Sequence, residues 1–316
     1  MKQPQSSAPR NWRKVTGDTE QPILLSTYTT ATPGAMAAFA EAGIPCYTSM
    51  PSCARAIRAL VDYALFQARR QGSQAVEETS PRLREDVGRA LAAAGPVLTE
   101  AEAKPLLARY GVPRSAELLV TSAEEAVTAA AEIGGPVALK VQSPDNTHKT
   151  EAGAVALGVS GDVAVGEAYQ RVMAAAKAAH PEATIVGVLV QAMARPGLEM
   201  IVGVTRDATF GPILMVGLGG IHVEALGDVI FSPVPLGHTA ALSLLGGLKG
   251  AAVLDGLRGA PPADSTALSG LIADLSRFAA DHGDLIKEID LNPVIVHAQG
   301  QGLTVVDALI VKRSPP

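Results

Sequence analysis

The stretch SPDNTHKTEAGAVALG, residues 143–158, decides how the rest of the chain is interpreted. It directly follows PVALKV (136–141), an apolar run that predicts a strand, so it is expected to leave that strand as a loop. His148, Lys149 and Gly153 lie close together in this loop. An imidazole and an ammonium can contact a phosphoryl group, and a glycine backbone can approach it without a Cβ in the way. The segment therefore predicts a phosphate-binding loop, with a solvated turn as the alternative.

Two side chains in this region are candidates for chemistry. Lys140 lies in the mostly apolar strand, where a buried ammonium needs an anionic partner. The alternative is an ordinary lysine on an exposed face of the strand. His148 is a candidate nucleophile, because neutral imidazole is the attacking form and an unperturbed pKa of about 6.5 leaves much of it neutral. The chain has no GxxxxGK[ST] motif, and GLGGIH (217–222) lacks the last glycine of GxGxxG, so neither a P-loop nor a Rossmann site is predicted.

Acidic and amide side chains gather near the C-terminus. Glu288, Asp290 and Asn292 alternate in EIDLN, and Asp307 falls in LTVVDALIV (303–311), which predicts the next strand. A period of two places the first three side chains on one face of their strand. Mg²⁺ prefers such oxygen ligands and completes its shell with water and phosphate oxygens. The pattern predicts either a magnesium site or an ordinary acidic edge strand.

Length and composition limit the fold class. At about 150 residues per domain, 316 residues predict two or three folding units. Hydrophobic residues make up 47% of the chain and aromatic residues 3%, so the core has to be built mainly from aliphatic side chains. This composition favours a mixed α/β (α+β) fold over an aromatic-rich β-sandwich. Cys46 and Cys53 match no zinc or redox spacing and are expected to be free thiols.

Charge and hydropathy exclude two classes of partner. A formal net charge of −5 gives no electrostatic footprint for nucleic acid or for an anionic membrane surface. The polar N-terminus has no signal-peptide core, and no run approaches the roughly 20 apolar residues of a membrane span. We therefore expect a soluble, cytoplasmic protein.

Four segments follow one another along the chain. Residues 1–21 are expected to be a flexible lead-in, and 22–70 predict a short β-α-β-α piece of flavodoxin-like type. The polar stretch that follows, 71–93, is expected to be an interdomain linker. Residues 94–312 alternate helices and strands, beginning with a helix whose capping box pairs Thr99 with Glu102.

Five separated segments carry a family resemblance. They are EAKPLLARYGVP, PVALKV, SPDNTHKTEAGAV, EMIVGVTRDATFGPILMVGLGGIHVEALGDV and EIDLNPVIV. In order and spacing they resemble the ATP-grasp region of nucleoside-diphosphate-forming acyl-CoA synthetases, over 94–312. The resemblance implies an ATP-grasp fold of two subdomains that hold ATP between them. By the same resemblance, 22–70 would be the remnant of a succinyl-CoA-ligase-like domain.

The resemblance also implies the site residues. Lys140 would contact the phosphates, and the glycine loop with Lys149 and Gly153 would close over them. His148 would relay the phosphoryl group as a phosphohistidine. The remaining implied contacts are Val190, Gln191 and Met193 as the adenine hinge, Glu199 as a further nucleotide contact, and Asn292, Asp307 and Asp290 as magnesium ligands.

The activity implied is that of an acid–CoA ligase (ADP-forming), which converts acid, ATP and CoA reversibly to acyl-CoA, ADP and phosphate. This chain would perform the ATP step with Mg²⁺, while a CoA-binding, alpha-like partner would hold CoA and a small carboxylic acid; an oligomer is expected. The alternatives are an ATP-grasp carboxylate–amine ligase and a non-catalytic nucleotide-binding subunit. Asn146 and Ala154 depart from the family pattern, and a Cβ at Ala154 would restrict loop closure if that position required a positive φ.

Overall fold

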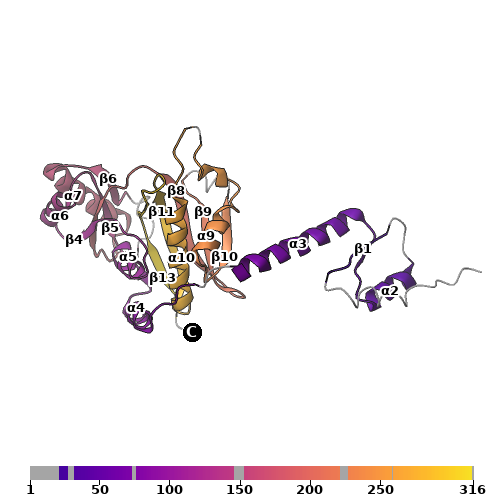
Figure 1. Cartoon of the computed structure of the whole chain (residues 1–316). Helices are drawn as coiled ribbons and strands as arrows, with labels where there is room; N and C mark the ends of the chain where they lie inside the picture. Colours follow the sequence, from indigo (N-terminus) through magenta and orange to yellow (C-terminus); the bar gives the residue numbers. More distant parts are fainter. Residues whose placement is uncertain are drawn as a thin grey trace, which may run out of the picture. The chain divides into compact units, whose positions relative to one another are not determined.

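The computed structural model describes residues 21–27, 32–72, 76–145, 153–220, 227–257 and 259–314, with the side chains at 69–72 left out. The chain folds as two compact units, Met1–Ser73 and Gln74–Pro316 (Figure 1). The boundary falls inside the segment expected to be a linker. Among the described residues, no helix is both long and apolar enough to cross a bilayer.

The first unit is the β-α-β-α piece that the sequence predicts. Strands β1 and β2 pair in parallel, and α2 begins with Pro33 after Thr32, whose hydroxyl accepts a hydrogen bond from the backbone N–H of Ala35. Its elements are β1 (Leu25–Ser26), α2 (Pro33–Glu41), β2 (Cys46–Tyr47) and α3 (Met50–Gly72).

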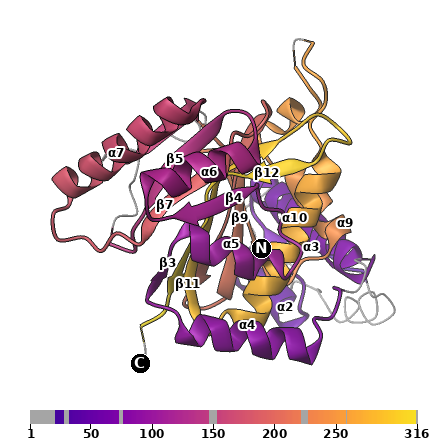
Figure 2. The same ribbon diagram turned by 90° about the vertical axis from the view of Figure 1, so that its left-hand side faces the viewer.

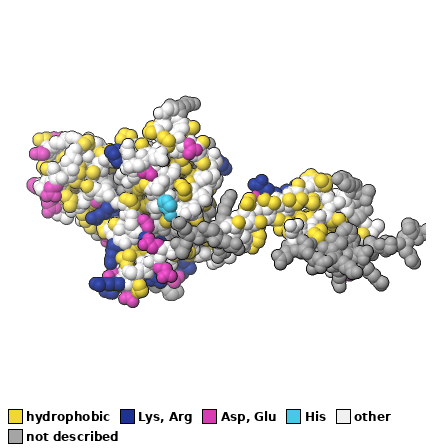
Figure 3. Space-filling view, viewed as in Figure 1, with side chains coloured by type: hydrophobic (Ala, Val, Ile, Leu, Met, Phe, Trp, Pro, Cys, Tyr) yellow, Lys and Arg dark blue, Asp and Glu magenta, His cyan; other side chains and the backbone are white. Residues whose placement is uncertain are grey.

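Helix α3 keeps large apolar side chains at the surface of this unit. Ile57, Val61, Tyr63 and Phe66 are all exposed, and hydrophobic side chains cover much of the helix in Figure 3. Within the described residues of the unit, the buried apolar side chains are Ile44 and Cys53. Two strands and two helices are too few to cover both faces of a doubly wound sheet.

The second unit begins with a helix where the sequence predicted a linker. Helix α4 (Pro81–Ala93) starts after Ser80, whose hydroxyl accepts from the N–H of Leu83. Val87 and Leu91 are fully buried in the core of this unit. The linker prediction for 71–93 is therefore wrong from residue 81 onward, because apolar side chains spaced by four residues were hidden among charged neighbours.

A four-stranded antiparallel sheet forms one lobe of this unit, with strand order β4-β7-β5-β6. Helices α6 and α7 cover one face of it (Figures 1 and 2), and their buried side chains share a core with Leu139, Val141 and Val190. We call this part the four-stranded lobe. It contains β4 (Glu117–Val120), α6 (Ala123–Ile133), β5 (Val137–Gln142), β6 (Val155–Val159), α7 (Asp162–Ala179) and β7 (Gly187–Ala192).

A seven-stranded sheet forms the other lobe, in the order β10-β9-β8-β11-β13-β3, with β12 paired to β11. Helices α4, α5, α9 and α10 supply side chains to its core, and we call this part the seven-stranded lobe. Its further elements are β3 (Val97–Leu98), α5 (Glu100–Ala108), β8 (Leu198–Asp207), β9 (Gly211–Leu218), β10 (Val229–Pro233), α9 (His238–Leu245), the 3₁₀ turn η1 (Ala251–Val253), α10 (Ser265–His282), β11 (Ile286–Val296), β12 (Leu303–Val305) and β13 (Leu309–Lys312).

The last strands of the chain are irregular. Strand β11 runs from Ile286 to Val296, and its pairing with β8 is irregular between Leu291 and Val294. The strand predicted at 303–311 is interrupted between β12 and β13, at residues 306–308. The N–H of Val306 instead donates to the carbonyl of Pro293. This interruption leaves the Val306 carbonyl available to side chains.

Candidate functional site

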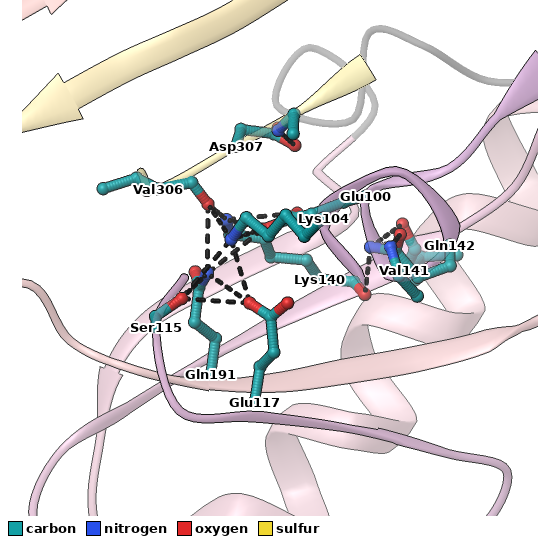
Figure 4. A network of polar contacts seen from close by, with 12 residues as sticks. Glu100, Lys104, Ser115, Glu117, Lys140, Val141, Gln142, Gln191, Val306 and Asp307 are labelled. Carbon is teal, nitrogen blue, oxygen red and sulfur yellow. Dashed lines mark hydrogen bonds and ion pairs between the residues drawn. The ribbon is translucent and has the colours of Figure 1, made fainter. Parts of the chain in front are cut away.

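A cluster of buried polar groups lies where the two lobes meet (Figure 4). We call it the buried cluster. Helix α5 and the strands β4, β5 and β7 contribute to it, together with Ser115 just before β4 and the break between β12 and β13. Its members are Glu100, Lys104, Ser115, Glu117, Lys140, Gln191 and the carbonyl group of Val306.

Lys140 is buried, with 4% of its surface exposed. Its Nζ atom lies 3.1 Å from Oε1 of Glu100 and 2.7 Å from the carbonyl oxygen of Val306. All six residues of β5 are buried, so the strand has no exposed face for a lysine. The interpretation of Lys140 as a buried ammonium with an anionic partner is confirmed, and the exposed alternative is wrong.

Lys104 is a second buried ammonium, only 1% exposed. Its Nζ lies 2.7 Å from Glu100 Oε1, 2.9 Å from Glu117 Oε2, 3.1 Å from the Val306 carbonyl and 3.3 Å from Ser115 Oγ. Glu100 and Lys104 are one helical turn apart, on the same side of α5. One ammonium therefore joins α5, the approach to β4 and the break in the last strands.

Gln191 completes the cluster from β7. Its Nε2 atom lies 2.7 Å from Ser115 Oγ and 3.0 Å from both Glu117 Oε2 and the Val306 carbonyl. Gln191 and Lys140 project from the sheet face opposite to the one that α6 and α7 cover, because their neighbours Val190, Leu139 and Val141 belong to that core. The polar face of the four-stranded sheet thus meets the seven-stranded lobe.

The cluster brings two ammonium groups and two carboxylates into a nearly water-free place. Removing charges from water costs several kcal/mol per ion, and mutual attraction offsets this only with good geometry. Sequence reasoning identified Lys140 and Gln191 but missed Glu100, Lys104 and Glu117. A signal was present, because Glu100 and Lys104 have i,i+4 spacing on a helix whose capping box, Thr99 with Glu102, is confirmed.

The other residues predicted to contact the nucleotide, Val190, Met193 and Glu199, are not members of the buried cluster. The side chain of Val190 is fully buried in the core of the four-stranded lobe and does not reach the buried cluster. Met193, just after β7, is 39% exposed. Glu199 is exposed on β8, next to Gly219 and Gly220. A Cβ on Gly220 would lie 2.8 Å from Oε2 of Glu199, so a side chain there would displace this carboxylate.

The predicted metal ligands lie along β11 and beside Val306. Glu288 and Asn292 are exposed and Asp290 is half-buried, while Ile289 and Leu291 between them are buried in the core. Alternation therefore holds the three polar side chains off the core face, as predicted. Figure 4 shows Asp307 next to Val306, at the edge of the buried cluster.

Electrostatics supports a cation near these carboxylates. Burial, together with the nearby carboxylates of Glu288 and Asp307, raises the pKa of Asp290 to about 6. A divalent cation between them would relieve this repulsion, so the residues fit Mg²⁺. In the part of the chain that the structure describes, no group of three His, Cys, Asp or Glu side chains is preformed as a metal site. The few oxygen ligands that Asp290, Asn292 and Asp307 offer suit Mg²⁺, because this ion takes most of its ligands from water and phosphate.

The loop that opened the sequence argument is described only in part. His148 and Lys149 lie outside the described residues, as does Asn146. Gly153 has a φ of 65°, which a glycine adopts without strain. Ala154 is fully buried among the side chains of the four-stranded lobe. Its methyl group therefore packs in the core. This position gives no support to the expectation that the Cβ of Ala154 restricts closure of the loop.

Comparisons with known proteins agree with this architecture. Residues 89–311 match the family model of the ATP-grasp domain. The chain is 40% identical over 216 residues to the β subunit of the ADP-forming acetate–CoA ligase II of Pyrococcus furiosus, covering 68% of this chain and 92% of that subunit. It is 36% identical over 261 residues to the ADP-forming acetate–CoA ligase I of Archaeoglobus fulgidus, covering 82% of this chain but 38% of that protein. The chain thus spans well under half of this longer relative.

Solved structures extend the comparison. An acetyl-coenzyme A synthetase 1 of Ca. Korarchaeum cryptofilum, in complex with coenzyme A and Ca-AMPCP, has a TM-score of 0.68 and 39% identity, covering 73% of this chain and 99% of that one. In another structure of this synthetase, with coenzyme A and Mg-AMPPCP, the phosphohistidine segment points towards the nucleotide binding site (TM-score 0.62, 36% identity, coverage 73% and 100%). With a family model that matches most of its length and a β subunit covered almost completely, this chain belongs to the ATP-grasp family and matches the β subunits of ADP-forming acetate–CoA ligases.

Proposed function

We propose that this chain is the ATP-binding and phosphoryl-transferring half of an ADP-forming acyl-CoA synthetase. The observation that carries the proposal is the position of Lys140, whose buried ammonium lies at the junction of the lobes, 2.7 Å from the carbonyl of the residue before Asp307. A cationic group and a candidate magnesium ligand are thereby held next to each other. Phosphoryl transfer needs this combination, because it depends mainly on positioning and charge neutralisation.

The comparisons support the same reaction class. The two relatives described above are ADP-forming acetate–CoA ligases, and the related synthetase from Ca. Korarchaeum cryptofilum has been solved with coenzyme A together with Ca-AMPCP or Mg-AMPPCP. Its phosphohistidine segment supports a histidine relay in the family. For this chain the acid, the role of His148 and the partner are proposals.

The proposed mechanism assigns a task to each group. Lys140 leaves Glu100 and contacts the β- and γ-phosphates, while the backbone at Gly153 and the ammonium of Lys149 close over them. The imidazole of His148 attacks the γ-phosphorus as the bond to the β-phosphate oxygen breaks, which releases ADP. The phosphoryl group then passes to the acid, and the thiol of CoA displaces phosphate from the acyl phosphate.

Metal and nucleotide contacts complete the assignment. Asn292, Asp307 and Asp290 would hold Mg²⁺, which supplies charge neutralisation for the phosphate oxygens. The segment from Val190 to Met193 would contact adenine, through the backbone at Val190 because that side chain is buried, and Glu199 would contact the nucleotide beside the glycine pair. CoA would be bound mainly by an alpha-like partner, in the cytoplasm and in an oligomer.

The experiment that tests this function is reconstitution. The intact chain is mixed with the CoA-binding subunit of a related ADP-forming ligase, acetate, CoA and Mg·ATP, and products are followed by mass spectrometry. The proposal expects acetyl-CoA and ADP in equal amounts, with Lys140→Met reducing both. Formation of an amide when an amine replaces CoA would favour a carboxylate–amine ligase, and ATP binding without turnover would favour a non-catalytic subunit.

A further inference from the structure

Lys104 takes no part in the proposed mechanism, yet it is among the most buried polar side chains of the chain. Its ammonium has three N–H donors and four acceptors between 2.7 and 3.3 Å. These acceptors belong to α5, to Ser115 and Glu117 at the start of β4, and to the break between β12 and β13 (Figure 4). From a helix of the seven-stranded lobe, Lys104 thus contacts both lobes.

The carboxylate of Glu100 connects Lys104 to Lys140. Oε1 of Glu100 is shared, at 2.7 Å from Lys104 and 3.1 Å from Lys140. Lys140 also reaches Oε2 of Glu100, at 3.3 Å, so the carboxylate is held by both ammonium groups, with the shorter contact to Lys104. When anionic phosphates draw Lys140 away, Lys104 remains as the positive charge beside Glu100. The buried carboxylate then keeps a partner throughout the binding of the nucleotide.

The backbone of Val306 connects Lys104 to Asp307. Lys104 lies 3.1 Å from the carbonyl oxygen of Val306, and the N–H of Val306 donates to the carbonyl of Pro293. Val306 is therefore held on both sides of its backbone. It immediately precedes Asp307, and Pro293 immediately follows Asn292. The same ammonium consequently acts on the backbone next to Asn292 and Asp307, two of the three proposed magnesium ligands.

We infer that Lys104 is a positioning residue for phosphoryl transfer, which holds Glu100 against Lys140 and holds the Val306 backbone that places Asp307. This inference rests on the proposed function and adds a residue to it. It explains why a second lysine is buried where one would suffice to contact phosphate. A purely structural lysine would stabilise the fold without changing how the site responds to Mg²⁺.

The test compares four substitutions in the intact chain. Lys104→Met keeps the apolar stem and removes the charge, Lys104→Gln keeps hydrogen-bond donors, and Lys104→Arg keeps the charge. The matched control is Lys312→Met, because Lys312 also binds backbone carbonyls, those of Ala92 and Ala94 at the end of α4. Dissociation constants for ATP are measured at a series of Mg²⁺ concentrations, with the unfolding midpoint recorded for each protein.

We expect Lys104→Met to weaken Mg·ATP binding by about tenfold or more and to raise the Mg²⁺ concentration needed for half-maximal binding, since small displacements of such groups are costly. Lys104→Arg should recover part of the Mg·ATP affinity and part of the Mg²⁺ dependence. Lys312→Met should leave these two quantities unchanged. If Lys104→Met does not fold, Lys104→Gln decides. An unchanged Mg²⁺ dependence in the folded variants, or the same shift in Lys312→Met, overturns the inference. A wild-type chain that binds no Mg·ATP would overturn the proposed function instead.

Discussion

The Nζ atom of Lys140 lies 2.7 Å from the carbonyl oxygen of Val306, so a side chain of the four-stranded lobe touches the backbone of the seven-stranded lobe one residue before Asp307. A group suited to phosphate and a group suited to Mg²⁺ are therefore coupled through a single hydrogen bond. The predictions that follow concern this junction, the carboxylate of Asp290 and helix α4, which packs in the core of the seven-stranded lobe.

Replacement of Lys140 by Met should abolish tight nucleotide binding. The substitution removes the ammonium that would contact phosphate but leaves Glu100 paired with Lys104, so this carboxylate keeps a cationic partner. We expect a loss of up to about a hundredfold in ATP affinity, because a hydrogen bond to a charged group contributes about 1.5–3 kcal/mol. Isothermal titration with Mg·ATP measures it, and Lys177→Met, an exposed lysine on α7, should bind as the wild type does.

Replacement of Glu100 by Gln should destabilise the chain strongly. Glu100 is fully buried beside two ammonium groups, and removing one member of such a set leaves uncompensated buried charge. The expected loss is about 3–5 kcal/mol in the free energy of unfolding, measured by denaturant titration. Glu85→Gln, at an exposed position of α4, is the control and should change stability by less than about 0.5 kcal/mol. Equal stability of the two variants would mean that the cluster carries no net ionic stabilisation.

Removal of the Asp290 carboxylate should change how stability depends on pH in Mg²⁺-free buffer. The pKa of Asp290 is raised from 3.8 to about 6, so between these values the folded chain keeps a proton that the unfolded chain has lost. Its contribution to stability therefore falls as pH rises from about 4 to 6 and stays unfavourable above. Asp290→Asn should gain about 1–3 kcal/mol over the wild type at pH 7, with little difference at pH 3.5.

The opposite trend, a variant that loses stability at pH 7 relative to pH 3.5, would contradict this environment for Asp290. Saturating Mg²⁺ with ATP should reduce the gain, because a cation bound among the carboxylates removes the repulsion that raises the pKa.

Helix α4 should be required for the stability of the ATP-grasp unit. Leu91 is fully buried in the core, so Leu91→Ala is expected to cost about 2–5 kcal/mol in unfolding free energy. Arg82→Ala, on the exposed side of α4, should cost little. Chemical denaturation of both variants distinguishes a packed helix from a linker, since in a linker the two substitutions would be equally harmless.

Local sequence signals predicted much of the fold but not the partners within the site. The capping box of Thr99 and Glu102 marked the start of α5, and the apolar run around Lys140 indicated that this lysine needs a buried anion. Which anion it meets depends on tertiary packing, because Glu100 is forty positions away. The helix α4 was mistaken for a linker because charged residues surround its apolar stripe.

The break at Val306 shows a second limit. The residues 303–311 are mostly apolar and resemble one strand, and only pairing with two different parts of β11 divides them into β12 and β13. The carbonyl freed by that division accepts hydrogen bonds from Lys104, Lys140 and Gln191. No local sequence pattern predicts that a backbone carbonyl will accept these bonds. The full membership of the buried cluster therefore became known only from the structure.

The most direct measurement of the central claim is transfer of the γ-phosphoryl group of ATP to the chain itself. The intact protein is incubated with γ-labelled ATP, Mg²⁺ and the CoA-binding subunit of a related ADP-forming ligase, and the label on this chain is tested for the acid lability and base stability of phosphohistidine. The account predicts labelled wild-type protein with release of ADP, and no label in His148→Ala although that variant still binds Mg·ATP. Undiminished labelling of His148→Ala, or a wild type that binds Mg·ATP and never becomes labelled, would contradict it.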